Sequence, residues 1–236
     1  MGTDNVFYKG TQKRQKRKEE IMEQRATTWL IVCEGAVTEK EYFEKLAQYI
    51  NENGEHPIEV NVIGTGKNTI SLVRNVEDFF AEVDKEVGKV YIPYEKVCVV
   101  FDKDSFEKQQ FNTAIHMGEA KGYIVAWSNE CFELWYLLHF HYFCTDLTRD
   151  EYFDKLGEFI SAQSGKKQKY IKGDANNFDT MMQYGSLENA IKNAERLLRE
   201  SSFETSYSNR KPATNVVEIV KMLLEEGKCI LDEKNK

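Results

Sequence analysis

The sequence predicts an α/β domain, built on a parallel sheet flanked by helices, with a C-terminal helical extension. The first part of the chain alternates short, continuously apolar segments with longer segments in which apolar residues recur every three or four positions. Continuous apolar strands separated by helices are typical of a parallel sheet covered on both faces. From about residue 148 onward only the helical pattern is present, so the extension is expected to pack on the sheet domain.

The strands are expected at residues 27–33, 58–63, 96–101 and 123–127, where the runs are apolar and rich in β-branched side chains. The helices between them are expected at 39–53, from Asn68 or Thr69 to about Glu86, from Ser105 to about Ala120, and at 130–140. Thr38 followed by Glu41 has the spacing of a capping box, and Ser105 is expected to cap the third of these helices. Helical spacing returns at 152–160, 187–198 and 216–224.

Three segments follow from this pattern: a basic N-terminal arm at 1–26, the α/β domain at 27–147, and the helical extension at 148–236. The arm holds a cluster of basic side chains between Lys13 and Lys18, and a second basic cluster lies at Lys166–Lys172. Each cluster is either a set of solvated charges or a contact for phosphates.

Composition excludes several classes of protein. The 236 residues contain 32 Lys and Arg against 39 Asp and Glu, a net charge of −7, so the chain as a whole is not a basic nucleic-acid binder. No apolar run approaches the roughly 18 residues that cross a bilayer, and the polar start of the chain does not resemble a signal peptide. The five cysteines are scattered without a C-x-x-C pair, which favours the cytoplasm over secretion and argues against a zinc ribbon.

Polar residues follow each expected strand, and ligands of parallel sheets bind beyond the carboxyl ends of the strands. Glu34 follows the first strand, and Asp102 and Asp104 follow the third. In extended backbone, residues two apart point the same way, so both aspartates could share one cation with Glu34. A divalent cation such as Mg²⁺ would offset the repulsion among these three carboxylates. The alternative for Asp104 is a helix cap.

The turn Gly64-Thr65-Gly66-Lys67 before the second helix is a candidate phosphate contact, because backbone N–H groups at a glycine turn can bind anions. It is not a P-loop, since Asn61 and Asn68 break that motif. A plain tight turn is the alternative.

Three further candidates lie later in the chain. Glu133 sits on a very apolar helix, where a carboxylate needs either an ion-pair partner or a role in the active site. Asn129 is a candidate helix cap or support for the site. Tyr170, with Lys169 and Lys172 beside it, either stacks on a base while the lysines bind phosphate or belongs to an ordinary exposed loop.

Taken together, the motifs resemble those of RloB-like proteins, which resemble Toprim-domain proteins. The resemblance covers about residues 30–225. It rests on these motifs, in chain order: Val32-Cys33-Glu34-Gly35, Thr38-Glu39-x-x-Tyr42-Phe43, Gly64-Thr65-Gly66-Lys67-Asn68-Thr69, Phe101-Asp102-Lys103-Asp104, Ser128-Asn129-x-x-Phe132-Glu133-Leu134-Trp135, Tyr170-x-Lys172 and Ala213-Thr214-Asn215-Val216.

The resemblance implies a Toprim fold (a Rossmann-like sheet), dependence on Mg²⁺ or Mn²⁺, and a role in phage defence as an abortive-infection or restriction-linked component. In the Toprim pattern, Glu34 would act as general acid or base, and Asp102 and Asp104 would hold the metal. A further acidic or polar residue near the metal would be Glu39, Asn129 or Glu133. A basic residue beyond the last strand would be Lys169 or Lys172.

The resulting functional hypothesis is a metal-dependent nuclease that hydrolyses phosphodiester bonds of DNA or RNA. Metal ions and carboxylates supply what this chemistry needs: charge neutralisation and proton transfer. The alternative is a Toprim-like component that senses or binds a nucleic acid or nucleotide and needs a protein partner, encoded nearby, for activity. The sequence leaves open the substrate, the oligomeric state and the number of metal ions.

Overall fold

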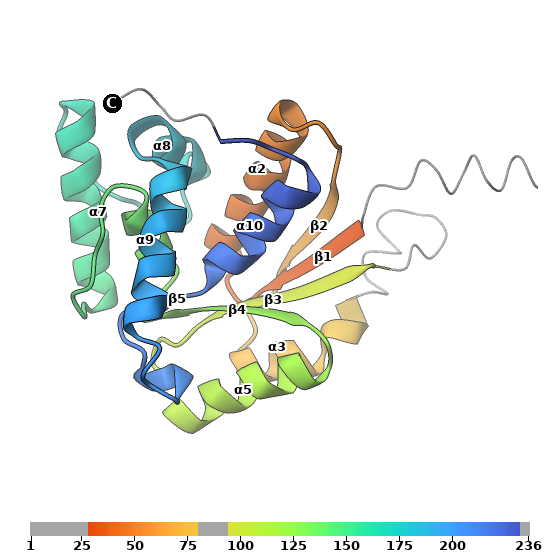
Figure 1. Cartoon of the computed structure of the whole chain (residues 1–236). Helices are drawn as coiled ribbons and strands as arrows, with labels where there is room; N and C mark the ends of the chain where they lie inside the picture. The colour runs from red at the N-terminus through yellow and green to blue at the C-terminus, as the bar shows by residue number, and fades with distance from the viewer. Residues whose placement is uncertain (1–27, 80–93, 232–236) are drawn as a thin grey trace, which may run out of the picture.

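The computed structural model describes residues 28–79 and 94–231, so the expected basic arm at 1–26 lies outside the described residues. A five-stranded sheet in the order β2-β1-β3-β4-β5 forms its centre (Figure 1). The strands are β1 (Thr28–Cys33), β2 (Glu59–Gly64), β3 (Lys96–Asp102), β4 (Ile124–Asn129) and β5 (Ala213–Thr214). The first four are parallel, and β5 pairs antiparallel with β4. The predicted α/β class with a parallel sheet is therefore confirmed.

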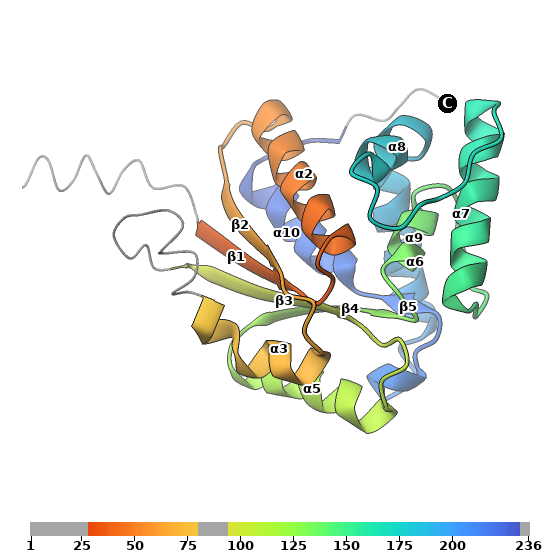
Figure 2. The same cartoon turned by 180° about the vertical axis from the view of Figure 1, so that it is seen from behind.

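Helices cover both faces of the sheet, as the views from two sides show (Figures 1 and 2). One face carries α3 (Thr69–Arg74) and α5 (Lys108–Ala120), and the other carries α2 (Thr38–Asn53) and α10 (Val216–Glu226). Four further helices extend this second layer: α6 (Glu133–Leu138), α7 (Arg149–Ser164), α8 (Asn177–Tyr184) and α9 (Leu187–Glu200). Helix α8 contacts α2, α9 contacts α10, and α7 lies farther out against α6 and α8. Cover on both faces explains why β1 is buried along its whole length and apolar from Trp29 to Cys33.

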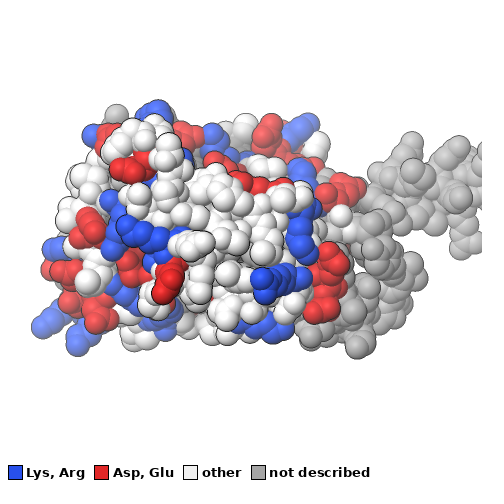
Figure 3. Space-filling model, turned by 90° about the horizontal axis from the view of Figure 1, so that it is seen from below, with Lys and Arg blue, Asp and Glu red and all other residues white. Residues whose placement is uncertain are grey.

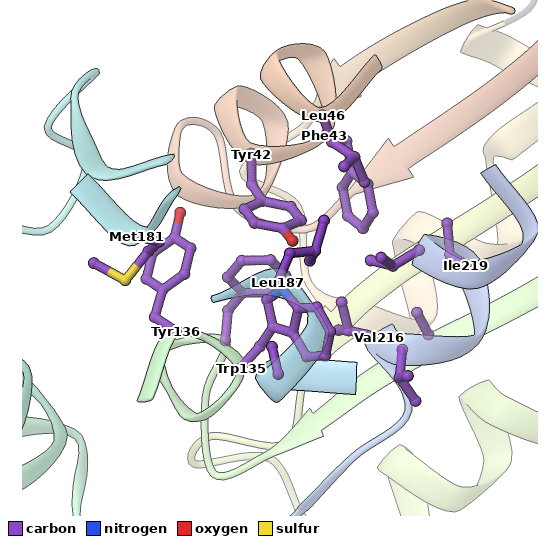
Figure 4. Close-up of a cluster of buried hydrophobic side chains, with 14 of the residues drawn as sticks. Tyr42, Phe43, Leu46, Trp135, Tyr136, Met181, Leu187, Val216 and Ile219 are labelled. Carbon is purple, nitrogen blue, oxygen red and sulfur yellow. The ribbon is translucent and has the colours of Figure 1, made fainter. Parts of the chain in front are cut away.

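The larger of two hydrophobic cores joins the helical extension to the sheet domain. Figure 4 shows side chains from α2, α6, α8, α9 and α10 meeting in this core. The rings of Tyr42 and Trp135 lie edge to face, with centroids 6.3 Å apart. Every residue of α6 is buried, so this short helix is held from all sides, together with the carboxylate of Glu133 at its start.

Helix starts differ from the sequence predictions at two places. Val37 is the N-cap of α2, so Thr38 is already helical and the Thr38–Glu41 capping box does not form. Ser105 does not cap α5, which begins at Lys108. The residues before α5 form a turn instead, in which the Phe106 N–H donates to the Lys103 carbonyl (3.0 Å).

The second predicted helix is interrupted at Asn75, and helical structure resumes over residues 76–79. Asn68 caps α3 by accepting a hydrogen bond from the Ser71 N–H, as one of the two alternatives foresaw, but α3 ends at Arg74. Residues 80–86, the end of the predicted helix, lie outside the described residues.

The expectation that the extension is only helical is wrong at β5, which adds an edge to the sheet. Asn215, directly after β5, binds the neighbouring strand β4 through its side chain. Its Oδ1 accepts a hydrogen bond from the Trp127 N–H (2.6 Å), and its Nδ2 donates to the Val125 carbonyl (2.9 Å). This amide satisfies backbone groups that an edge strand would otherwise leave unpaired.

Replacing Asn215 with Ala is expected to destabilise the fold by about 2–4 kcal/mol, because two buried backbone groups lose their partners. Urea unfolding followed by circular dichroism measures this free energy. Asn189→Ala, at an exposed position of α9, is the matched control and should change it by less than about 0.5 kcal/mol. Equal stability of the two variants would contradict the role of Asn215.

Candidate functional site

Acidic side chains gather where β1 and β3 end. These strands are neighbours in the sheet, so Glu34 and Asp102 meet as the sequence predicts. The Glu34 N–H donates to the Val100 carbonyl (2.8 Å), and its Oε2 accepts a hydrogen bond from the Asp102 N–H (3.2 Å). The Thr69 hydroxyl lies 3.3 Å from the same oxygen, so backbone and side-chain donors fix the Glu34 carboxylate.

Glu39 brings a third carboxylate from the first turn of α2, and it is only 4% exposed. It lies so close to Gly35 that a Cβ at that position would be 1.7 Å from Glu39 Oε2. Glycine is therefore required at position 35 for this carboxylate to lie where it does. Among the described residues, Glu39 Oε2 is buried without a hydrogen-bond partner.

Glu133, the first residue of α6, is fully buried. Its Oε1 accepts a hydrogen bond from the Tyr170 hydroxyl (3.1 Å), while its Oε2 is buried and finds no partner within the described part of the chain. Buried polar groups are rarely left unpaired. Glu39 and Glu133 thus each present a carboxylate oxygen that a cation or a proton would satisfy.

The backbone conformation at Asp104 differs from the extended one that the sequence predicts. Its φ of 39° is left-handed, so the extended geometry expected for Asp102-x-Asp104 does not hold. Both carboxylates nevertheless face one guanidinium group: Arg149 Nη2 lies 3.2 Å from Asp104 Oδ2 and 3.7 Å from Asp102 Oδ2.

Sequence reasoning missed Arg149, although two signals were present. Thr148 and Glu151 have capping-box spacing, which the structure confirms at the start of α7. That places Arg149 in the first helical turn, where the helix dipole disfavours a positive charge. A cation at such a position indicates an acidic partner elsewhere in the fold.

Burial and neighbouring charges raise the pKa of three carboxylates in this site. Burial, followed by the carboxylates of Glu39, Glu133 and Glu34, raises the pKa of Asp102 well above its ordinary value, against the opposing effect of Arg149. Burial is also the main reason that the pKa of Glu34 rises to about 7. The pKa of Glu39 is also raised, chiefly by burial and then by Glu133, against a backbone hydrogen bond and the charges of Lys172 and Arg149, which lower it. The cluster therefore disfavours full ionisation without a compensating cation.

A cavity of about 480 Å³ opens beside these carboxylates. Its lining includes Glu34, Glu39, Gly66, Lys67, Phe106 and Lys172. Lys67 and Lys172, predicted as phosphate contacts, thus lie in the same cavity as two of the acidic residues. Phosphate oxygens could occupy this space between lysines and carboxylates.

The glycine turn has a structural use in this fold. The Thr65 and Gly66 N–H groups donate to the Cys33 and Glu34 carbonyls (3.0 and 2.9 Å), so neither is free to bind a phosphate. Gly64 lies against the backbone of the following loop, since a Cβ there would be 2.5 Å from the Ala36 carbonyl oxygen. Lys67 is the residue of this turn with a side chain suited to bind an anion.

Three other predicted residues lie away from the cavity. Lys169 is exposed and not part of the lining. Tyr170 is 8% exposed, with its ring packed against Tyr136 and Phe153, so the predicted stacking on a base is not available to it. The buried amide of Asn129 donates to two backbone carbonyls of the 208–210 segment and neither caps α6 nor supports the carboxylates.

The side chains at this site fit a hard divalent cation in their chemistry. The donors are carboxylate oxygens, and two of these are buried without partners in the part of the chain that the structure describes. In the described residues, however, no three His, Cys, Asp or Glu side chains are placed to hold one ion together. Metal binding would therefore require the carboxylates to turn, and Arg149 to give up its contacts with Asp102 and Asp104.

The basic side chains on the described face formed by α3 and α5 are dispersed (Figure 3). Figure 3 shows the face formed by α3 and α5, where lysine and arginine side chains form separate groups between uncharged areas. The part of this face that the structure describes thus offers no continuous positive track for a duplex. Within the described residues, no helix has the length and apolar character needed to cross a membrane.

Comparison with known proteins gives one match. A family model described as "RloB-like protein" matches residues 29–223. This range includes Arg149 and the two lysines that line the cavity, Lys67 and Lys172. It also includes the five residues of the acidic cluster, which are Glu34, Glu39, Asp102, Asp104 and Glu133. Searches of curated proteins and of solved structures found no match.

Proposed function

This chain belongs to the RloB-like family, and on that basis we propose that it is a metal-dependent phosphodiesterase of the Toprim type that cleaves DNA or RNA. One observation carries the proposal. Within residues 28–79 and 94–231, Glu39 and Glu133 each keep a buried carboxylate oxygen without a partner, beside Glu34 and Asp102. A divalent cation would satisfy these oxygens and neutralise the cluster.

The residues around the cavity match the needs of phosphodiester hydrolysis. Asp102 and Asp104, with Glu34, would hold Mg²⁺ or Mn²⁺, and the buried Oε2 atoms of Glu39 and Glu133 would face the same ion. When bound, the ion would neutralise charge on the phosphate. Glu34 is suited to move a proton, because its carboxylate is fixed by two donors and its pKa is raised to about 7. Lys67 and Lys172 would bind phosphate oxygens and so orient the substrate.

The cellular setting in the proposal is cytoplasmic phage defence. All five cysteines are free and four of them are buried, which suits a reducing compartment. The defence role rests on the resemblance to abortive-infection and restriction-linked components. A protein partner encoded nearby would restrain the activity of a nuclease inside the cell.

The activity is tested by incubating the full chain with supercoiled plasmid, single-stranded DNA and total tRNA, each in Mg²⁺, Mn²⁺ or EDTA. Cleavage of at least one substrate that EDTA abolishes is the expected result. Binding of nucleic acid without cleavage in either metal would overturn the nuclease proposal and favour a sensing component that needs a partner.

The cavity lysine gives a more specific prediction. Lys172→Ala is expected to raise KM by about tenfold with kcat changed less than about twofold, because a phosphate contact is lost while the carboxylates stay in place. Steady-state cleavage of a fluorescent oligonucleotide measures both constants.

The matched control for this prediction is Lys166→Ala, which removes the same charge from an exposed position that does not line the cavity. It should leave both constants unchanged. An equal rise of KM in the two variants would show that general charge, and not the cavity, governs substrate binding.

A further inference from the structure

We propose that Arg149 is an internal counter-ion of the carboxylate cluster, which a divalent metal displaces and which then binds the substrate phosphate. This inference rests on the proposed function and adds a residue that links metal binding to substrate binding. It assigns to Arg149 a role in positioning the substrate.

The contacts of Arg149 place it in competition with a metal ion. A single nitrogen, Nη2, lies within 4 Å of carboxylate oxygens from both Asp102 and Asp104, the two residues expected to hold the metal. In the described part of the chain, no other ion pair involves either aspartate. A guanidinium and a metal ion cannot both occupy the space between these oxygens.

The position of Arg149 in its own helix also favours displacement. The N-terminal turn of α7 repels a cation through the helix dipole, so the acidic cluster holds Arg149 there against a local electrostatic penalty. When a doubly charged ion neutralises the same carboxylates, that attraction is lost. The side chain is 32% exposed, so it has room to move toward solvent.

The rest of the guanidinium is suited to bind an anion. Its Nε is buried and, among the described residues, has no hydrogen-bond acceptor, which leaves a donor available in the cluster. Arginine binds phosphate through paired N–H groups, a geometry that lysine cannot reproduce. A phosphate that binds near the metal could therefore accept hydrogen bonds from Arg149 Nε and from Nη2 once Nη2 has left the aspartates.

The test compares the full-length protein with Arg149→Gln and Arg149→Lys. Lys155→Gln is the matched control, because it removes one positive charge from the same helix at a side chain that is 41% exposed and pairs with Glu158. Circular dichroism first establishes that each variant is folded. Electron paramagnetic resonance then measures Mn²⁺ binding, and fluorescence anisotropy measures binding of a phosphorothioate single-stranded oligonucleotide with and without Mn²⁺.

The two ligands should respond in opposite directions. Arg149→Gln is expected to bind Mn²⁺ about tenfold more tightly, since a competing charge is gone, and to lose about tenfold of the oligonucleotide affinity in Mn²⁺. Arg149→Lys should keep part of the competition but not the oligonucleotide affinity. The control should match the wild type in both measurements.

Three other outcomes have distinct meanings. Unchanged or weaker Mn²⁺ binding by Arg149→Gln would overturn the inference while leaving the proposed function standing, because a merely structural arginine does not oppose the metal. Unchanged oligonucleotide binding would overturn its phosphate step. A wild-type protein that binds no Mn²⁺ would contradict the proposed function itself.

Discussion

Asp102→Asn is expected to lower the rate of nucleic-acid cleavage by a factor on the order of 10³, because the amide cannot replace a carboxylate as a ligand of the metal. The substitution keeps the size of the side chain. Asp102 is 7% exposed at the end of β3, so a larger change would disturb packing. Initial rates at saturating Mg²⁺ measure the effect.

The control for this variant is Asp154→Asn, which makes the same chemical change at an exposed position of α7. It should cleave at the wild-type rate, and both variants should have circular dichroism spectra like that of the wild type. Cleavage by Asp102→Asn at the rate of the control would mean that the acidic cluster is not the active site.

In the absence of metal, the free energy of unfolding is expected to fall as pH rises. Glu34 has an ordinary pKa of 4.5, and burial raises it to about 7 in the fold. As pH rises from 4.5, the unfolded chain releases this proton first, so the folded state loses stability until pH passes 7. The shift corresponds to a loss of about 3 kcal/mol for this one group. Asp102 and Glu39 act in the same direction.

Thermal unfolding in EDTA is therefore expected to give a lower Tm at pH 8 than at pH 5.5. Mg²⁺ should restore much of the difference at pH 8, because an ion that binds only the folded state stabilises it. Glu34→Gln should reduce the dependence on pH but not abolish it, since Asp102 and Glu39 still titrate with raised pKa values. A Tm in EDTA that stays constant or rises over this interval would contradict the pKa shifts.

Most of the sheet could be predicted because its strands carry a strong local signal. The core of β3, Cys98–Phe101, is continuously apolar and buried, as a strand covered on both faces must be. The strand β5 could not be predicted in this way. It has two residues, too few to show any periodicity, and pairing with β4 and the side chain of Asn215 define it.

The part of the candidate site that lies at the carboxyl ends of the strands could be predicted from the sequence. Glu34 and Asp102 meet because β1 and β3 are neighbours, an arrangement that the general rule for parallel sheets anticipates. Arg149 comes from the extension, more than forty residues after Asp102, and only the tertiary packing of α7 brings it to the cluster. The burial of Tyr170 likewise depends on packing that no local pattern encodes.

Metal binding by the acidic cluster is the claim on which the proposed chemistry depends. Anomalous diffraction from crystals of the full chain grown with Mn²⁺ at pH 8 tests it most directly. We expect an anomalous peak coordinated by Asp102 and Asp104, with the Arg149 guanidinium withdrawn from both. A map without a peak at these carboxylates, in which Arg149 keeps its contacts with both aspartates, would contradict the account.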